Sequence, residues 1–325
     1  MKVIDGAHVT PQPRALAIGN FDGVHRGHQE LVRVALERGA AVGAAAGVLT
    51  FTPHPARIFA PALAPPLIVS LERRLELLEA AGAQQAIVEA FTPAFAAIEA
   101  ESFVADVLVG RMGAREVVVG YDFSFGRARR GNPAMLQALG RELGVGVTIV
   151  PAVTLDGLPC SSTKVREFVL EGRVEGAGLL LGRPVEITGT VVHGAGRGRA
   201  LGVPTANLAP EAELLPRLGI YAAWAHLLGP GGAVVSSHRA ALSVGTNPTF
   251  QSTPAAKGTA PEGGAGTTVE PSVEPYLLDF EGDLYGRRLR LDVMHRLRDE
   301  RRFETTAALV AQIEADVAEV RARLP

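Results

Sequence analysis

The sequence has little of what marks several classes of protein. Its only cysteine is Cys160, so no disulfide can form within the chain, which fits a reducing compartment. It has no run of about 20 apolar residues. Its N-terminal stretch, MKVIDGAHVTPQPR, lacks the apolar core of a signal peptide. We therefore expect a cytoplasmic protein without a membrane span.

Excess charge of either sign is also missing. Lys and Arg number 32 and Asp and Glu 34, which gives a formal net charge of −2. Because nucleic-acid-binding domains usually carry a strongly basic surface, no nucleic-acid partner is expected. With 47% hydrophobic and 20% charged residues, the composition is that of a soluble globular protein. The 325 residues are enough for two domains.

Up to about residue 181, short apolar runs alternate with helical patterns. Ser70 and the pair Asn132-Pro133 are typical helix starts. Strands are predicted at 15–18, 45–51, 86–90, 117–119 and 145–150, with helices at 28–38 and 71–81. Such alternation predicts βαβ units around a parallel sheet, where ligands bind beyond the carboxyl ends of the strands.

The pattern changes after Gly182-Arg183-Pro184. Strand-like runs separated by glycine and proline lie at 185–192, 220–226, 240–244, 276–280 and 289–294. They predict a small antiparallel barrel or sandwich. An amphipathic helix is expected at 305–323, with Leu309, Ile313, Val317 and Val320 on one face. The segment 251–272, rich in Gly, Pro, Ser and Thr, is predicted to be a mobile loop.

The stretch GNFDGVHRGHQE, residues 19–30, places two histidines at the junction between a predicted strand and a predicted helix. A helix N-terminus favours an anion, and imidazoles there can donate hydrogen bonds to phosphate oxygens. Gly27 removes a side chain that would block close approach. Taken alone, the two histidines are as typical of ordinary loop residues near a helix cap as they are of a phosphate-binding site.

A second stretch, SSTKVREF at 161–168, puts hydroxyl groups at a helix start and an arginine one turn later. Alone it is typical of a capped helix with a solvated arginine. Together with the histidines it resembles the SSTxxR phosphate clamp of HxGH nucleotidyltransferases. These enzymes transfer a nucleotidyl group from a nucleoside triphosphate to a phosphate and release pyrophosphate. Catalysis there comes from alignment and charge stabilisation, without a protein nucleophile.

Two further stretches, TFTPHPARIF at 50–59 and GYDFSFGRARRG at 120–131, narrow the resemblance to the bacterial bifunctional riboflavin kinase/FAD synthetase family. The resemblance implies a Rossmann-like N-terminal domain with the catalytic residues His25, His28, Ser162, Thr163 and Arg166. It also implies nucleotide- and flavin-binding residues: Gly19, Asn20, Phe21, Asp22, Gly27, Pro53, His54, Pro55, Phe59, Asp122, Phe123 and Phe125. Aromatic rings are natural partners for an isoalloxazine. Without the resemblance, the phenylalanines predict a hydrophobic core.

In the second half, GTVVHGAGRGRALGVPTANL at 189–208 is the most specific stretch. Its Gly-rich part, with Arg197 and Arg199, can wrap a polyphosphate, although a basic surface turn has the same composition. Pro204 favours an extended chain, which would turn Thr205 and Asn207 to one side. Two oxygen-bearing side chains beside phosphates suit Mg²⁺.

This stretch resembles the riboflavin kinase module, as do SVGTNPTF at 243–250 and VEPYLLDFEGDLYG at 273–286. The match implies that Glu274 is the general base for the ribityl hydroxyl, that Thr205 and Asn207 bind Mg²⁺, and that Arg298 approaches the flavin or phosphate. The other binding residues it implies are Gly194, Gly198, Arg199, Gly202 and Pro204. The segment 251–272 is longer than the family's usual link and holds a second Val-Glu pair, Val269-Glu270. Alone, Glu274 could equally be a rim carboxylate.

The resemblance as a whole implies an FMN adenylyltransferase at 1–182 and a riboflavin kinase with a small antiparallel barrel and a terminal helix at 183–325. Riboflavin and ATP would give FMN, and FMN and a second ATP would give FAD and pyrophosphate, with Mg²⁺ serving both steps. We expect a monomer or weak homo-oligomer. Two alternatives remain open: a nucleotidyltransferase for another metabolite with a regulatory barrel, or a barrel that binds nucleic acid through GRGR.

Overall fold

The computed structural model describes residues 1–194, 203–246 and 271–325, and the chain forms two compact units. The first unit comprises Met1–Val165 and Leu180–Gly182, and the second comprises Arg166–Leu179 and Arg183–Pro325. No helix of the described residues is both long enough and apolar enough to cross a membrane.

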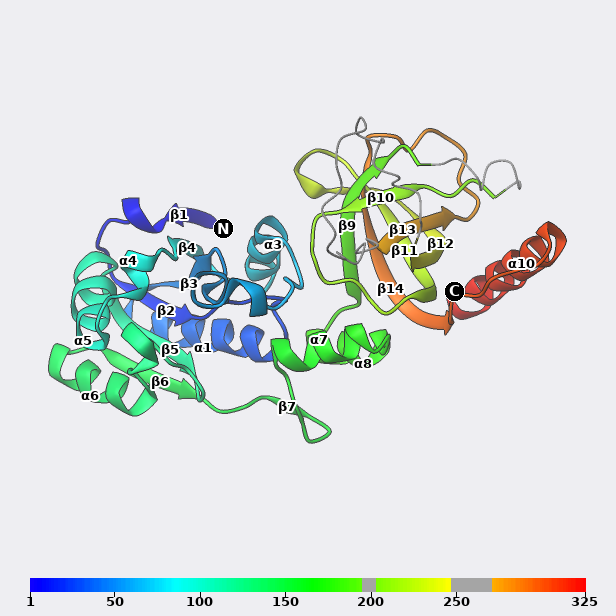
Figure 1. Ribbon diagram of the computed structural model, residues 1–325. Coiled ribbons are helices and arrows are strands. Elements are labelled where there is room, and N and C mark those ends of the chain that lie inside the picture. The colour runs from blue at the N-terminus through cyan, green and yellow to red at the C-terminus, as the bar shows by residue number, and fades with distance from the viewer. Residues whose placement is uncertain (195–202, 247–270) are drawn as a thin grey trace, which may run out of the picture. The chain divides into compact units, whose positions relative to one another are not determined.

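The first unit is built on six parallel strands in the order β1-β4-β3-β2-β5-β6 (Figure 1). The strands are β1 (Lys2–Asp5), β2 (Arg14–Ile18), β3 (Ala45–Thr52), β4 (Gln85–Ala90), β5 (Ala114–Gly120) and β6 (Gly146–Val150). The parallel sheet and the five predicted strands are confirmed. The sequence did not predict β1, a four-residue edge strand with mostly exposed side chains and no apolar periodicity.

Helices connect these strands or, in the case of the last two, follow β6 in the chain, and local capping sets where several of them begin. They are α1 (Arg26–Val42), α2 (Pro55–Phe59), α3 (Leu71–Ala80), α4 (Pro93–Ala96), α5 (Ala100–Ser102), a π-helix (Phe103–Arg111), α6 (Pro133–Leu143), α7 (Ser162–Leu170) and α8 (Val174–Leu181). The Ser70 hydroxyl accepts a hydrogen bond from the Arg73 N–H at 3.2 Å, and Asn132 Oδ1 accepts one from the Met135 N–H at 3.0 Å. Both predicted caps are therefore confirmed.

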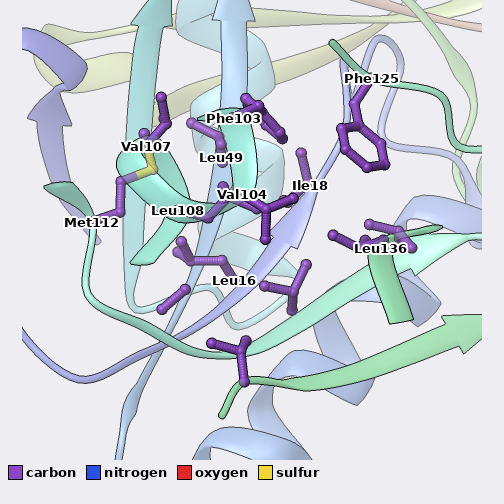
Figure 2. Packing of buried hydrophobic residues seen from close by; sticks show 14 of the residues in the cluster. Leu16, Ile18, Leu49, Phe103, Val104, Val107, Leu108, Met112, Phe125 and Leu136 are labelled. Atoms are coloured by element: carbon purple, nitrogen blue, oxygen red, sulfur yellow. The ribbon is translucent and has the colours of Figure 1, made fainter. Parts of the chain in front are cut away.

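The central strand β2 is buried on both faces. Leu16 and Ile18 point into a hydrophobic cluster that includes Leu108 of the π-helix (Figure 2). On the other face α1 packs closely, because a Cβ on Gly39 would lie only 3.2 Å from the Ala15 Cβ. Burial on both sides is typical of a central parallel strand. It places the carboxyl end of β2 in the middle of the sheet edge where ligands bind.

The second unit is a closed antiparallel barrel with the strand order β10-β13-β12-β11-β14-β9, which settles the choice between barrel and sandwich (Figure 1). Its strands are β9 (Val185–Val192), β10 (Asn207–Pro210), β11 (Gly219–Leu228), β12 (Val234–Thr246), β13 (Pro271–Leu277) and β14 (Arg288–Arg298). A two-stranded ribbon, β7 (Thr154–Leu155) and β8 (Leu158–Pro159), precedes α7 in the chain.

The predicted strand at 276–280 is wrong at its end, because β13 ends at Leu277. Asp279 has a φ of +58°, a left-handed conformation that ends the strand, and Leu278 packs instead against Val320 and Leu324. The predicted loop at 251–272 is wrong at its end, since residues 271 and 272 belong to β13. Residues 251–270 lie outside the described part of the chain.

The C-terminal helix α10 (Thr306–Arg323) begins one residue after the predicted start, with the Thr305 hydroxyl accepting a hydrogen bond from the Ala308 N–H at 3.2 Å. Val317 and Val320 pack with Trp224 on the outside of the barrel. The predicted apolar face is therefore confirmed at its C-terminal end.

Candidate active sites

The turn between β2 and α1 holds the first candidate site, and its backbone is unusual. Phe21, Gly23 and Val24 all have positive φ, at +51°, +82° and +41°. The Val24 N–H donates to the Phe21 carbonyl at 3.1 Å, which closes the turn. A left-handed conformation is uncommon for a β-branched residue, and such strain clusters at functional sites.

The two histidines lie together at the start of α1. His25 is the N-cap, and its Nδ1 accepts a hydrogen bond from the His28 N–H at 3.4 Å. The two rings stack with centroids 3.7 Å apart, and the His28 ring lies 5.1 Å from that of Phe21. His25 is buried and His28 half-buried. Two imidazoles therefore share the helix terminus that favours an anion, as the sequence predicts.

Gly27 has a packing reason that sequence reasoning did not identify. A Cβ at this position would lie 3.0 Å from the Cys160 carbonyl oxygen and 3.1 Å from the His25 ring. The glycine thus lets the first turn of α1 pack against the segment that leads into α7. Cys160 itself is buried, and burial raises the pKa of its thiol while the charge of Arg26 lowers it. It fills its place as a small apolar group.

The hydroxyl groups of SSTKVREF have three different environments. Ser161 Oγ accepts a hydrogen bond from the Lys164 N–H at 3.2 Å and so caps α7. The Ser162 hydroxyl donates to the Asp22 carbonyl oxygen at 2.8 Å, which ties α7 to the β2–α1 turn. Thr163 is exposed, and Arg166 lies half-buried one turn further along α7. The predicted helix start is confirmed.

A cavity of about 640 Å³ lies next to this turn in the first unit. Two residues of the turn, Gly19 and Asn20, belong to its wall, and the Asn20 Nδ2 lies 3.3 Å from the His54 Nε2. The predicted binding residues that line it are Gly19, Asn20, His54, Pro55, Phe59, Asp122, Phe123 and Phe125. The structure therefore brings together residues from three separate stretches of the sequence, 19–20, 54–59 and 122–125.

Four other residues of the predicted set are not on the wall that the described residues form: Phe21, Asp22, Gly27 and Pro53. Pro53 is exposed and Phe21 fully buried. The Asp22 carboxylate is also buried and accepts hydrogen bonds from the Ile68 N–H at 3.1 Å and the Val69 N–H at 3.4 Å. The side chains of Phe21 and Asp22 are used for packing and for holding the backbone, whereas Gly27 has no side chain.

Sequence reasoning missed part of the cavity wall, including four of its phenylalanines. Phe91, Phe95 and Phe103 line it together with Phe51, and neighbouring rings have centroids 5.6–6.2 Å apart. The spacing of four residues in F-T-P-A-F, residues 91–95, was a usable signal, because it puts two rings near one helix start. Phe125 is buried in the core cluster and also lines the cavity, while its place in an FMN pocket stays a prediction.

The second candidate site lies on the barrel around the PTAN segment. Ala206 and Leu208 are buried, whereas Thr205 and Asn207 are half-buried, so the side chains alternate as in an extended chain. The prediction that Thr205 and Asn207 face one side is confirmed. A Cβ on Gly194 would collide with the Asn207 side chain, so a glycine is needed there. Pro204 is exposed, and Gly198, Arg199 and Gly202 lie outside the described residues.

Strand register brings Glu274 beside this segment. Leu208 of β10 pairs with Val273 of β13, and the Ala206 N–H donates to the Pro275 carbonyl at 2.9 Å. Asn207 therefore lies opposite Glu274, at a Cβ separation of about 5 Å for such a pair. Because Leu208 and Val273 are buried, Asn207 and Glu274 share the outer face. An amide and a carboxylate that are 67 positions apart thus meet.

Arg298 has a definite partner. Its Nε and Nη2 donate to the two carboxylate oxygens of Asp316 on α10, at 2.8 and 2.6 Å. Both side chains are largely buried, and Gln312 donates to the same carboxylate. The guanidinium therefore ties β14 to α10. An approach of Arg298 to a flavin or phosphate stays a prediction.

Comparison with known proteins covers both units. The family model "FAD synthetase" matches residues 8–164, and the model "Riboflavin kinase" matches residues 181–324. The bifunctional riboflavin kinase/FMN adenylyltransferase of Escherichia coli K12 is 35% identical over 97% of this chain and 96% of its own length. That of Pseudomonas fluorescens is 36% identical over 99% of this chain and 97% of its own length.

A solved structure shares the fold along the whole chain. The crystal structure of a Streptococcus pneumoniae protein, described as a macrolide-efflux protein, has a TM-score of 0.83 and 30% identity. The match covers 99% of each chain. The efflux description applies to that protein, and the shared architecture is what this chain has in common with it.

Proposed function

The protein belongs to the family of bifunctional riboflavin kinases/FMN adenylyltransferases, and on that premise we infer how each part of the chain performs its reaction. It phosphorylates riboflavin to FMN with ATP, and it adenylylates FMN to FAD with release of pyrophosphate. We assign adenylylation to residues 1–182 and phosphorylation to residues 183–325. The match of residues 181–324 to a riboflavin kinase argues against a merely regulatory barrel.

One observation carries the adenylyltransferase assignment. The aromatic cavity and the histidine turn share Gly19 and Asn20, so the cavity adjoins the turn that leads to the N-terminus of α1. An isoalloxazine suits the aromatic wall, and phosphates suit the helix terminus. The volume of about 640 Å³ is within the usual range of ligand pockets.

In the adenylylation step, an oxygen of the FMN phosphate attacks the α-phosphorus of ATP, and pyrophosphate leaves. His25 and His28 donate hydrogen bonds to the phosphate oxygens and stabilise the charge that develops on them. Thr163 and Arg166 add a hydroxyl and a cation from α7, while Ser162 holds the start of that helix on the turn. No covalent intermediate is needed, since alignment of the two substrates supplies much of the rate.

In the phosphorylation step, Glu274 accepts the proton of the ribityl 5′-hydroxyl as its oxygen attacks the γ-phosphorus of ATP, and ADP leaves. Thr205 and Asn207 offer oxygen ligands on the same face as Glu274, a donor set that fits Mg²⁺. The ion would be held by these two side chains together with substrate phosphates. When bound, it supplies charge screening for the phosphates.

Product analysis tests the function directly. Purified protein with riboflavin, ATP and Mg²⁺ should form FMN and then FAD, separated by chromatography. Starting from FMN, it should form FAD and pyrophosphate in equal amounts. Absence of both flavin nucleotides would refute the assignment.

Phe95 provides a test of the cavity as the flavin site. We expect Phe95→Ala to weaken FMN binding about tenfold, since an aromatic pair contributes roughly 0.5–1.5 kcal/mol beyond its buried area. Quenching of flavin fluorescence measures the dissociation constant. Phe280→Ala is the matched control, because Phe280 lies in the second unit and packs on His238. Equal binding by wild type and Phe95→Ala would place the flavin elsewhere.

We also propose a cytoplasmic location, where ATP is abundant, and a lone buried cysteine fits that compartment. We further propose that the protein is a monomer or a weak homo-oligomer and that it has no nucleic-acid partner. Light scattering measures the oligomeric state, and salt-dependent RNA binding tests for a nucleic-acid partner.

A further inference from the structure

Asp22 lies at the centre of the strained turn that carries the histidines. It is 1% exposed, and Phe21, Gly23 and Val24 around it all have positive φ. Its side chain is not on the cavity wall formed by the described residues. A buried carboxylate in such a place costs free energy unless hydrogen bonds compensate it, so its contacts indicate its role.

The carboxylate holds the chain segment that leads into α3. Oδ1 accepts from the Ile68 N–H at 3.1 Å and from the Val69 N–H at 3.4 Å, and Oδ2 lies 3.2 Å from the Ile68 nitrogen. The turn packs tightly on the same residue, since a Cβ on Gly23 would lie 2.9 Å from the Ile68 Cδ1. Hydrogen bonds of a carboxylate to backbone N–H groups are among the stronger ones.

Arg74, on the first turns of α3, supplies a buried positive charge near this carboxylate. It is 3% exposed, and burial lowers the pKa of its guanidinium while the charge of Asp22 raises it. Its Nη1 lies 3.4 Å from the Phe51 carbonyl oxygen at the end of β3. Asp22 is therefore coupled to both α3 and the neighbouring strand.

The backbone of the turn is fixed from two further directions. The Asp22 carbonyl accepts from the Ser162 hydroxyl at 2.8 Å, and the Val24 carbonyl accepts from the Gln29 Nε2 at 3.0 Å. The first hydrogen bond links the turn to α7, and the second links the turn to α1. The position of the histidines relative to the start of α7 thus depends on the hydrogen bonds of this turn, and Asp22 accepts those from Ser162, Ile68 and Val69.

We propose that Asp22 is a positioning residue for adenylyl transfer, which sets the spacing between the His25/His28 pair and the start of α7 without touching substrate. Ser162 acts with it through the Asp22 carbonyl. The proposal rests on adenylylation as the reaction of residues 1–182. It assigns to Asp22 a role different from binding nucleotide, flavin or metal.

The test is Asp22→Asn in the full-length protein. The amide keeps one acceptor oxygen but turns an NH₂ group toward backbone donors, which displaces the turn. We expect kcat for FAD formation from FMN to fall about 10- to 100-fold, since small misplacements of reacting groups cost this much. KM for FMN and the half-saturating Mg²⁺ concentration should stay within about twofold of wild type, because the displaced turn alters alignment and not the ligands themselves.

The matched control is Asp5→Asn, because the Asp5 carboxylate also accepts a backbone N–H, from Ala7 at 2.9 Å, but is exposed. It should leave both activities unchanged. Ser162→Ala should repeat the pattern of Asp22→Asn, as it loosens the same turn from the other side. Riboflavin phosphorylation by the same polypeptide reports whether the variants are folded.

Three results would overturn the proposal. A large rise in the Mg²⁺ requirement of Asp22→Asn would make Asp22 a metal ligand, and a rise confined to KM for FMN would make it a flavin contact. A parallel loss of riboflavin phosphorylation would show a general effect on folding. Failure of the wild-type protein to form FAD would instead refute the proposed function itself.

Discussion

Replacing Glu274 by glutamine should lower the formation of FMN from riboflavin by about 10²- to 10⁴-fold, the range that a positioned general base contributes. The amide has nearly the same shape but cannot accept the ribityl proton. Glu274 is half-buried and lies opposite Asn207 in the strand register, so the substitution leaves the oxygens of the proposed Mg²⁺ site in place.

The measurement separates the two activities of one polypeptide. Chromatography of reactions started from riboflavin reports phosphorylation, and reactions started from FMN report adenylylation, which should stay within about twofold of wild type. Glu281→Gln is the matched control, because Glu281 is an exposed glutamate in the turn after β13. Equal loss of both activities in Glu274→Gln, or an equal effect of Glu281→Gln, would contradict the assignment.

Replacing His28 by alanine should produce the opposite pattern. FAD and pyrophosphate formation from FMN should fall about 10²- to 10³-fold, as when one donor to a developing charge is removed. The His28 ring stacks on His25 at 3.7 Å and approaches Phe21 at 5.1 Å, so the substitution removes the proposed phosphate donor and also loosens its partner imidazole.

Riboflavin phosphorylation is the internal reference for this variant and should persist. His8→Ala is a suitable comparison, since the His8 side chain is 82% exposed and pairs only with the nearby Asp5 among its described ion-pair partners. FAD formation at the wild-type rate in His28→Ala would remove the histidine pair from the mechanism. A joint loss of FMN formation would mean that the substitution acts on folding.

The parts of the fold that the sequence predicted are those that depend on neighbours in the chain. Ser70, Asn132 and Thr305 cap the expected helices, because a side-chain oxygen meets an N–H three residues away. The strands of the parallel sheet were predicted because each is a short apolar run that is visible in the local sequence. The error at 276–280 arose because an apolar run looks like a strand whether it enters a barrel or, like Leu278, packs under a helix.

In the candidate sites, too, the residues that could be predicted are those whose signal lies within a short stretch of the chain. The motifs around His25, Ser162 and Asn207 were recognisable because each is a short run of residues. The aromatic wall from Phe91 to Phe103 was missed, since its rings meet only after α4, α5 and the π-helix have packed against the sheet. The Asp22 carboxylate, expected at a ligand, instead meets the backbone of Ile68, which is 46 positions away.

By itself, the sequence determined the family, the two chemistries and the short stretches that carry them, because residue order and spacing are local properties of the chain. Only the tertiary structure decided which distant residues meet: Asn207 with Glu274, Arg298 with Asp316, and Asp22 with Ile68. The first contact follows from strand register, where a shift of one residue would turn a side chain to the other face, and the other two follow from the packing of segments that are distant in the sequence.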